Sequence, residues 1–131
     1  MSNRRPPLIL ITADDQAVCE ALQFALRLEG LSVHTHCEAA ALLTDPELPA
    51  ATCVIVDDHK PYLDGFELLQ QLRIREKEVP VILLTNHATG RIRARAARAG
   101  VQTVLEKPLL DNVLIDSIQT ILASASAAGS A

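Results

Sequence analysis

Acidic, hydroxyl and ammonium side chains follow short apolar runs in a pattern that could bind or transfer a phosphoryl group. They lie at or just after the ends of four such runs: Asp14, Asp15, Asp57, Asp58, Thr85 and Lys107. Clustered carboxylates repel one another, and a divalent cation such as Mg²⁺ offsets that repulsion while keeping waters and phosphate oxygens as further ligands. The lysine supplies a fixed positive charge and the threonine a hydrogen-bond donor. The set therefore indicates metal-assisted phosphoryl chemistry on a nucleophilic carboxylate.

Each of these residues also has an ordinary structural explanation. An Asp-Asp pair at a strand end is commonly a turn or a helix cap, and Asp14 or Asp15 could cap the helix that follows. The "KP" at Lys107 is commonly a turn that limits a helix, and Thr85 alone would be a strand-end residue. Only their joint placement at neighbouring strand ends points to a site, so the prediction depends on the fold.

Five apolar runs predict the sheet that would bring these residues together. The runs are "LILIT" from Leu8, "LSVHT" from Leu31, "CVIV" from Cys53, "PVILLT" from Pro80 and "VQTVL" from Val101. Three are apolar on both faces, as central parallel strands are, whereas the run from Leu31 alternates and suits an edge. Strands alternating with helices predict an α/β fold: a flavodoxin-like, doubly wound, five-stranded parallel sheet of order 2-1-3-4-5. Such sheets bind ligands beyond the carboxyl ends of the first and third strands.

Helices on both faces of this sheet are predicted from apolar residues at helical spacing, around residues 18–26, 38–43, 66–72, 90–99 and 114–122. Asp111 is the candidate N-cap of the last helix. We expect a lead-in at residues 1–7, one domain at 8–123, and a low-complexity tail at 124–131.

Composition limits the possible classes of function. The 131 residues are 49% hydrophobic and 21% charged, with a net charge of −4, so nothing suggests whole-domain nucleic-acid binding. The run "LILI" is too short for a signal peptide or a membrane span, and we expect a cytoplasmic protein with no membrane contact. Three cysteines, Cys19, Cys37 and Cys53, form no CxxC or zinc pattern and are expected to be buried thiols.

Two further clusters have plain explanations. His34 and His36 fall on one face of the expected edge strand, where a half-exposed polar face explains them better than a metal site. Arg91, Arg95 and Arg98 repeat at helical spacing, which is typical of a solvated helix face. A protein-docking role for residues 91–98 is the alternative.

The segments "ITADD", "VIVDDHKPYLDG", "VILLTN" and "VLEKP" resemble the receiver domain of bacterial two-component response regulators, which has the CheY-like form of this fold. The resemblance covers about residues 8–122, and "VLEKPLLDNVLIDSI" is most similar to FixJ/NarL-type receivers. In this family, the phosphoacceptor Asp precedes a Pro by four residues and a Gly by eight. Pro61 and Gly65 satisfy this spacing from Asp57, whereas Asp58 would require Tyr62 and Phe66.

The resemblance implies a role for each matching position. Asp57 would accept a phosphoryl group from a sensor histidine kinase or a phosphotransfer protein. Asp14, Asp15, Asp57 and the backbone carbonyl of His59 would hold Mg²⁺. Thr85 and Lys107 would contact the transferred group, so any catalysis would be limited to the domain's own phosphotransfer and dephosphorylation. Partner affinity would change at residues 91–98, by contact with a downstream protein or by self-association.

The sequence departs from the family pattern in places. Asn86 replaces a small residue, Val104 replaces the aromatic switch residue, and no DNA-binding domain is expected in this chain. These departures keep open a receiver-like binding module that works without phosphorylation. A phosphatase with an aspartyl nucleophile would want a carboxylate where His59 stands. A flavin protein would want a phosphate loop and aromatic residues.

Overall fold

A computed structural model of the chain describes residues 6–59, 64–76, 78–109 and 112–129. The expected Pro61 of the family spacing and the candidate cap Asp111 lie outside these residues. Five strands run in chain order: β1 (Leu8–Thr12), β2 (Ser32–His36), β3 (Cys53–Asp58), β4 (Val81–Thr85) and β5 (Thr103–Glu106). The helices that alternate with them are α1 (Gln16–Leu28), α2 (Ala39–Leu43), α3 (Gly65–Arg75), α4 (Gly90–Arg98) and α5 (Val113–Gly129), with a 3₁₀ turn η1 (Leu48–Ala50).

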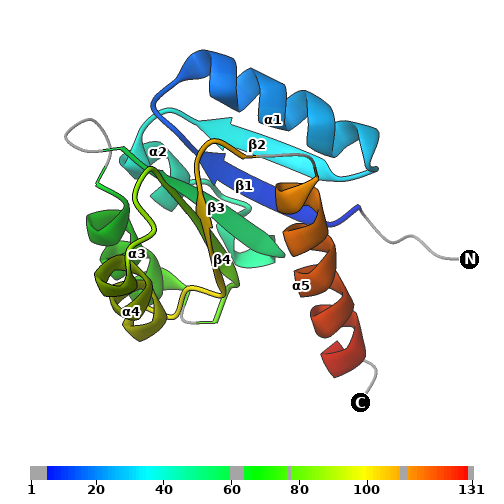
Figure 1. Ribbon diagram of the computed structural model, residues 1–131. Helices are drawn as coiled ribbons and strands as arrows, with labels where there is room; N and C mark the ends of the chain where they lie inside the picture. The colour runs from blue at the N-terminus through cyan, green and yellow to red at the C-terminus, as the bar shows by residue number, and fades with distance from the viewer. Residues whose placement is uncertain (1–5, 60–63, 77, 110–111, 130–131) are drawn as a thin grey trace, which may run out of the picture.

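The strands form one parallel sheet of order β2-β1-β3-β4-β5, which confirms the predicted fold (Figure 1). The alternating strand β2 lies at an edge, as predicted. In register, Thr12 of β1 pairs with Val56 of β3, and Asp58 of β3 pairs with Thr85 of β4. The carboxyl ends of β1, β3 and β4 therefore lie side by side, with the predicted site residues at that edge.

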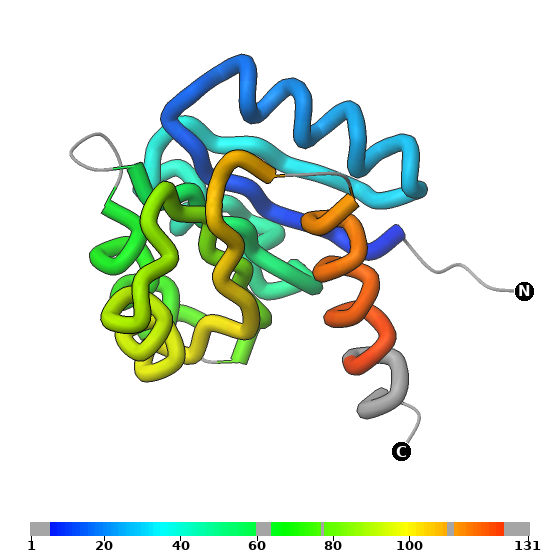
Figure 2. The backbone as a smooth tube through the Cα atoms, viewed as in Figure 1, coloured from blue at the N-terminus to red at the C-terminus, as the bar shows by residue number. Residues whose placement is uncertain are grey.

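Two apolar cores cover the two faces of the sheet because side chains alternate along each strand. Leu26 of α1 and Ile118 of α5 pack with one set of strand residues. Leu42 of α2, Leu69 of α3 and Ala96 of α4 pack with the other. Accordingly α3 and α4 run next to each other, across the sheet from α1 (Figures 1 and 2).

The C-terminal segment and the hydropathy of the helices can also be compared with the predictions. Helix α5 continues through residues 124–129, which the sequence pattern set apart as a tail. No helix among the described residues is both long and apolar enough to cross a membrane.

The prediction of three buried cysteines was wrong for Cys37. Cys19 and Cys53 are buried, and burial raises their thiol pKa values to about 11 and about 12 respectively. Cys37 is exposed: it follows the last residue of edge strand β2, and its thiol reaches the Gln16 side chain at the start of α1, at 3.4 Å.

Candidate phosphorylation site

The two aspartates at the end of β3 have different environments. Asp57 is only 3% exposed. The next side chain, Asp58, accepts a hydrogen bond from the backbone N–H of Gly65, at 2.8 Å, and so braces the start of α3. Only glycine fits there, since a Cβ on residue 65 would lie 2.9 Å from the Cβ of Asp58. Local structure therefore explains the "DG" pair. Asp64 caps α3 by accepting hydrogen bonds from two backbone N–H groups, and Gly65 allows α3 to begin close to Asp58.

Lys107 reaches Asp57 from the strand two places across the sheet. Its ammonium group forms an ion pair with Asp57 Oδ1. The backbone N–H of Lys107 also donates to the carbonyl of Thr85, at 2.8 Å, which ties the end of β5 to the end of β4. A nearly buried carboxylate thus has a fixed positive charge beside it.

Thr85 lies at the end of β4, between the strands that carry Asp57 and Lys107. The residue is 4% exposed, and its Oγ1 accepts a hydrogen bond from the His87 N–H at 3.3 Å. Asn86 is exposed, and Val104 is half-buried on β5.

The acidic pair after β1 divides into two roles. Asp15 caps α1, because its Oδ1 accepts from the N–H groups of Ala17 at 2.8 Å and Val18 at 3.3 Å. Asp14 instead contacts the imidazole of His59, whose Nδ1 lies 2.9 Å from each Asp14 carboxylate oxygen. From the sequence, only the backbone carbonyl of His59 was predicted to have a role, and this side-chain contact was not predicted. A histidine just past a strand end, facing an acidic strand end, is the signal that could have found it.

The donor chemistry at this edge fits Mg²⁺. Asp14 and Asp57 offer carboxylate oxygens from neighbouring strands, and Asp15 lies at the first turn of α1 beside Asp14. Among the described residues, no three His, Cys, Asp or Glu side chains already converge as a metal-binding group. Mg²⁺ does not require one, since it is usually held by one or two carboxylates and keeps several waters.

His34 and His36 form a polar, half-exposed face of β2, as predicted, but they also share a buried carboxylate that was not predicted. His34 Nδ1 and His36 Nε2 each lie 2.9 Å from Asp45 Oδ2. Burial acts to raise the pKa of the Asp45 carboxyl. Hydrogen bonds from the Glu47 N–H and from the two imidazoles outweigh burial and lower that pKa to about 2. The cluster is an internal brace between β2 and the segment after α2.

The arginines of α4 do not share one environment. Arg93 donates to the Ala88 carbonyl at 3.2 Å and to the Val104 carbonyl at 3.5 Å, so it links the β4–α4 loop to β5. Arg95 instead stacks on Phe66 of α3, with 4.1 Å between the guanidinium carbon and the ring centroid.

An α/β sheet of this order, with a buried carboxylate and a lysine at its carboxyl edge, is the arrangement expected of a receiver-type signalling domain. The family profile of the response regulator receiver domain matches residues 9–119, and the chain belongs to this family. It is a signalling module of two-component systems.

Named relatives agree with this assignment. The chain is 36% identical over 110 residues to the transcriptional regulatory protein FixJ of Azorhizobium caulinodans, covering 83% of this chain and 52% of FixJ. It is 31% identical over 118 residues to the response regulator protein TodT of Pseudomonas putida, covering 90% of this chain and 52% of TodT. The crystal structure of FixJ-N superposes with a TM-score of 0.75 at 28% identity, covering 90% of this chain and 94% of FixJ-N. The chain therefore spans about half the length of these curated relatives.

Proposed function

We propose that Asp57 is the phosphoacceptor of this receiver domain. The observation that carries the proposal is the contact of the nearly buried Asp57 carboxylate with the Lys107 ammonium group. Asp58 is a poorer candidate because one of its carboxylate oxygens holds the start of α3. The presence of the full set of matching residues disfavours a binding module that works without phosphorylation; these are Asp14, Asp15, Asp57, Thr85 and Lys107.

The proposed reaction is transfer of a phosphoryl group from the phosphohistidine of a sensor kinase or a phosphotransfer protein. An Asp57 carboxylate oxygen forms a bond to phosphorus, and the bond from phosphorus to the donor imidazole nitrogen breaks. The imidazole leaves with the electron pair of that bond. Lys107 would then pair with the new dianionic group, and the Thr85 hydroxyl would donate to one of its oxygens. The domain would also catalyse its own dephosphorylation.

Mg²⁺ would be held by Asp14, Asp15, Asp57 and the backbone carbonyl of His59. When bound, it supplies positive charge that stabilises the phosphoryl oxygens during transfer. Asp15 caps α1 through Oδ1 and would also bind the metal, so Asp15→Ala should weaken both metal binding and the cap of α1. Equal phosphorylation with Mg²⁺ and with EDTA would contradict the metal role.

The decisive experiment is intact-mass measurement after incubation with acetyl phosphate and Mg²⁺. We expect one added phosphoryl group in the unmodified protein and in Asp58→Asn, and none in Asp57→Asn. Addition that persists in Asp57→Asn would overturn the assignment. Asp58→Asn is a matched control because it removes the neighbouring carboxylate while keeping a hydrogen-bond acceptor for Gly65.

We further propose that residues 8–123 form the functional receiver unit in the cytoplasm, with 1–7 as a lead-in and 124–131 as an extension. Output would run through residues 91–98, toward a downstream protein or a second copy. Arg93 supports this route because it contacts both the β4–α4 loop and β5. We expect amide exchange over residues 86–99 to change with a beryllofluoride mimic. Changes confined to α1 would contradict the route.

A further inference from the structure

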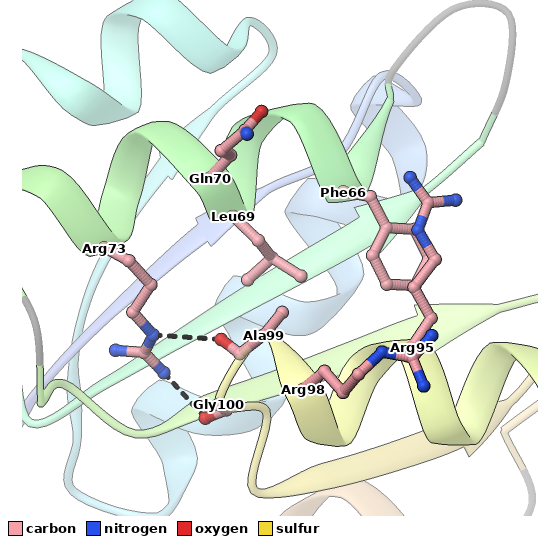
Figure 3. Close-up of a pocket in the computed structure, with 8 residues that line it drawn as sticks. All are labelled: Phe66, Leu69, Gln70, Arg73, Arg95, Arg98, Ala99 and Gly100. Carbon is pink, nitrogen blue, oxygen red and sulfur yellow. Dashed lines mark hydrogen bonds between the residues drawn. The ribbon is translucent and has the colours of Figure 1, made fainter.

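A pocket of about 560 Å³ lies between α3 and α4 (Figure 3). None of its lining residues belongs to the proposed phosphorylation site. The lining comes from the two helices and the turn after α4: Phe66, Leu69, Gln70, Arg73, Arg95, Arg98, Ala99 and Gly100. Its volume falls within the range of about 300–1,000 Å³ that is typical of small-molecule sites.

One wall of this α3–α4 pocket is apolar. Phe66 and Leu69 belong to the core of the sheet face that α3 covers, and Ala99 packs against the same cluster. Leu69 points into the space between the two helices (Figure 3). This wall would bury the apolar body of a ligand and release water from it.

One end of the pocket is held in place by Arg73. Its Nε donates to the Ala99 carbonyl at 3.2 Å, and its Nη2 donates to the Gly100 carbonyl at 2.7 Å, as the dashed lines of Figure 3 show. Glycine at residue 100 suits this approach. Its φ is +81°, and a Cβ would lie 3.1 Å from Arg73 Nε. The ends of α3 and α4 are therefore fixed to each other, and the pocket is preformed.

The pocket carries positive charge with no carboxylate in its lining. Arg95 lies over the ring of Phe66, and Arg98 extends along the same side of α4 (Figure 3). Within the described residues, the guanidinium groups of Arg95 and Arg98 donate no hydrogen bond and form no ion pair. Basic residues in the last turn of a helix do complement its dipole. The dipole explains why positive charge is favourable at this end of α4. It does not explain the guanidinium N–H groups, which remain available to donate hydrogen bonds to a ligand.

We propose that the α3–α4 pocket binds a small organic carboxylate with a flat apolar body. The carboxylate would accept hydrogen bonds from Arg98 and Arg95, since guanidinium groups match carboxylates in geometry and charge. The apolar body would lie against Leu69, Ala99 and the edge of Phe66. No residue of the Asp57 site lines the pocket, so binding can be tested on the unphosphorylated protein.

The test is a two-dimensional NMR titration of the full chain with sodium 2-naphthoate as the probe. We expect saturable shifts of the amides at residues 66–70 and 95–100. Two matched probes separate the parts of the ligand: 2-naphthalenemethanol keeps the ring without the charge, and acetate keeps the charge without the ring. Both should bind more weakly than 2-naphthoate. Equal binding of the alcohol would overturn the role of the arginines.

Arg98→Gln should weaken 2-naphthoate binding by about three- to tenfold, as expected for loss of one charged hydrogen bond at a partly exposed site. Arg75→Gln is the control, because it removes the same charge from the end of α3 without touching the pocket. Both residues are exposed, and circular dichroism would show that each variant folds.

Equal losses of 2-naphthoate affinity in Arg98→Gln and Arg75→Gln would mean that the anion is attracted by overall charge rather than by a specific site. That result would overturn the proposal. The proposal would also be wrong if 2-naphthoate shifted amides outside the pocket instead of those at residues 66–70 and 95–100. If no small carboxylate binds but an acidic peptide shifts these amides, the surface docks protein and the proposal is wrong.

Discussion

The imidazole of His59 lies against the carboxylate of Asp14, with 2.9 Å from its Nδ1 to each oxygen. The two residues are 45 positions apart, and their side chains are 41% and 21% exposed. His59 thus occupies oxygens that the proposed Mg²⁺ site would use. Metal binding at the proposed site would therefore compete with the contact between Asp14 and His59.

His59→Ala should therefore raise the apparent Mg²⁺ affinity. We expect an increase of roughly two- to fivefold, because a partly exposed contact of this kind is worth up to about 1 kcal/mol. Metal titration followed by NMR of the residues around Asp14 would measure it. His34→Ala is the control, since that imidazole contacts Asp45 instead. Unchanged or weaker Mg²⁺ binding in His59→Ala would show that the histidine assists the metal.

Removing the lysine at Asp57 should destabilise the fold. Lys107→Gln leaves a nearly buried carboxylate without its charge partner, and we expect a loss of about 1–3 kcal/mol in urea unfolding at neutral pH. The Asp57→Asn/Lys107→Gln double variant should recover part of that loss, because the unpaired charge is then absent. If the double variant loses more free energy of unfolding than the two single variants lose together, this account is wrong.

Gly65→Ala should destabilise the protein by about 1–3 kcal/mol, since the added Cβ would meet Asp58 Cβ at 2.9 Å and Val56 Cγ1 at 3.2 Å. Gly90→Ala is the matched control. Gly90 also begins a helix, but a Cβ there has open space around it, so the change should be neutral or slightly stabilising. If Gly65→Ala and Gly90→Ala changed the free energy of unfolding equally, in thermal or urea unfolding, the steric argument would be wrong.

Asp45 should contribute to the acid stability of the domain. Its pKa of about 2 lies below the ordinary value of 3.8, so its carboxylate favours the folded state above about pH 4. That contribution is lost as the pH falls from about 4 toward 2. Asp45→Asn should lower the free energy of unfolding at pH 7 by about 1–3 kcal/mol and flatten its pH dependence between 4 and 2. Glu20→Gln on the surface of α1 should leave that dependence unchanged.

Much of the fold could be read from the sequence. Apolar runs separated by helical spacing predicted the strand order, and "LSVHT" was correctly placed at an edge because it alternates. The set of Asp57, Thr85 and Lys107 was also predictable, since the carboxyl ends of parallel strands lie along the same edge of a sheet. For these residues, position along a strand is enough to say where the side chain lies.

The contacts that only the tertiary structure decided join residues whose directions depend on loops and packing. Asp15 turned to cap α1 while its neighbour Asp14 met His59. Asp45 became the shared partner of two histidines because the segment after α2 packs beside β2. The arginines of α4 have different contacts. Arg93 contacts the β4–α4 loop and β5, whereas Arg95 and Arg98 line the pocket between α3 and α4. Helical spacing shows which residues share a face. It cannot show what another helix places opposite that face, because crossing helices meet through side chains far apart in the sequence.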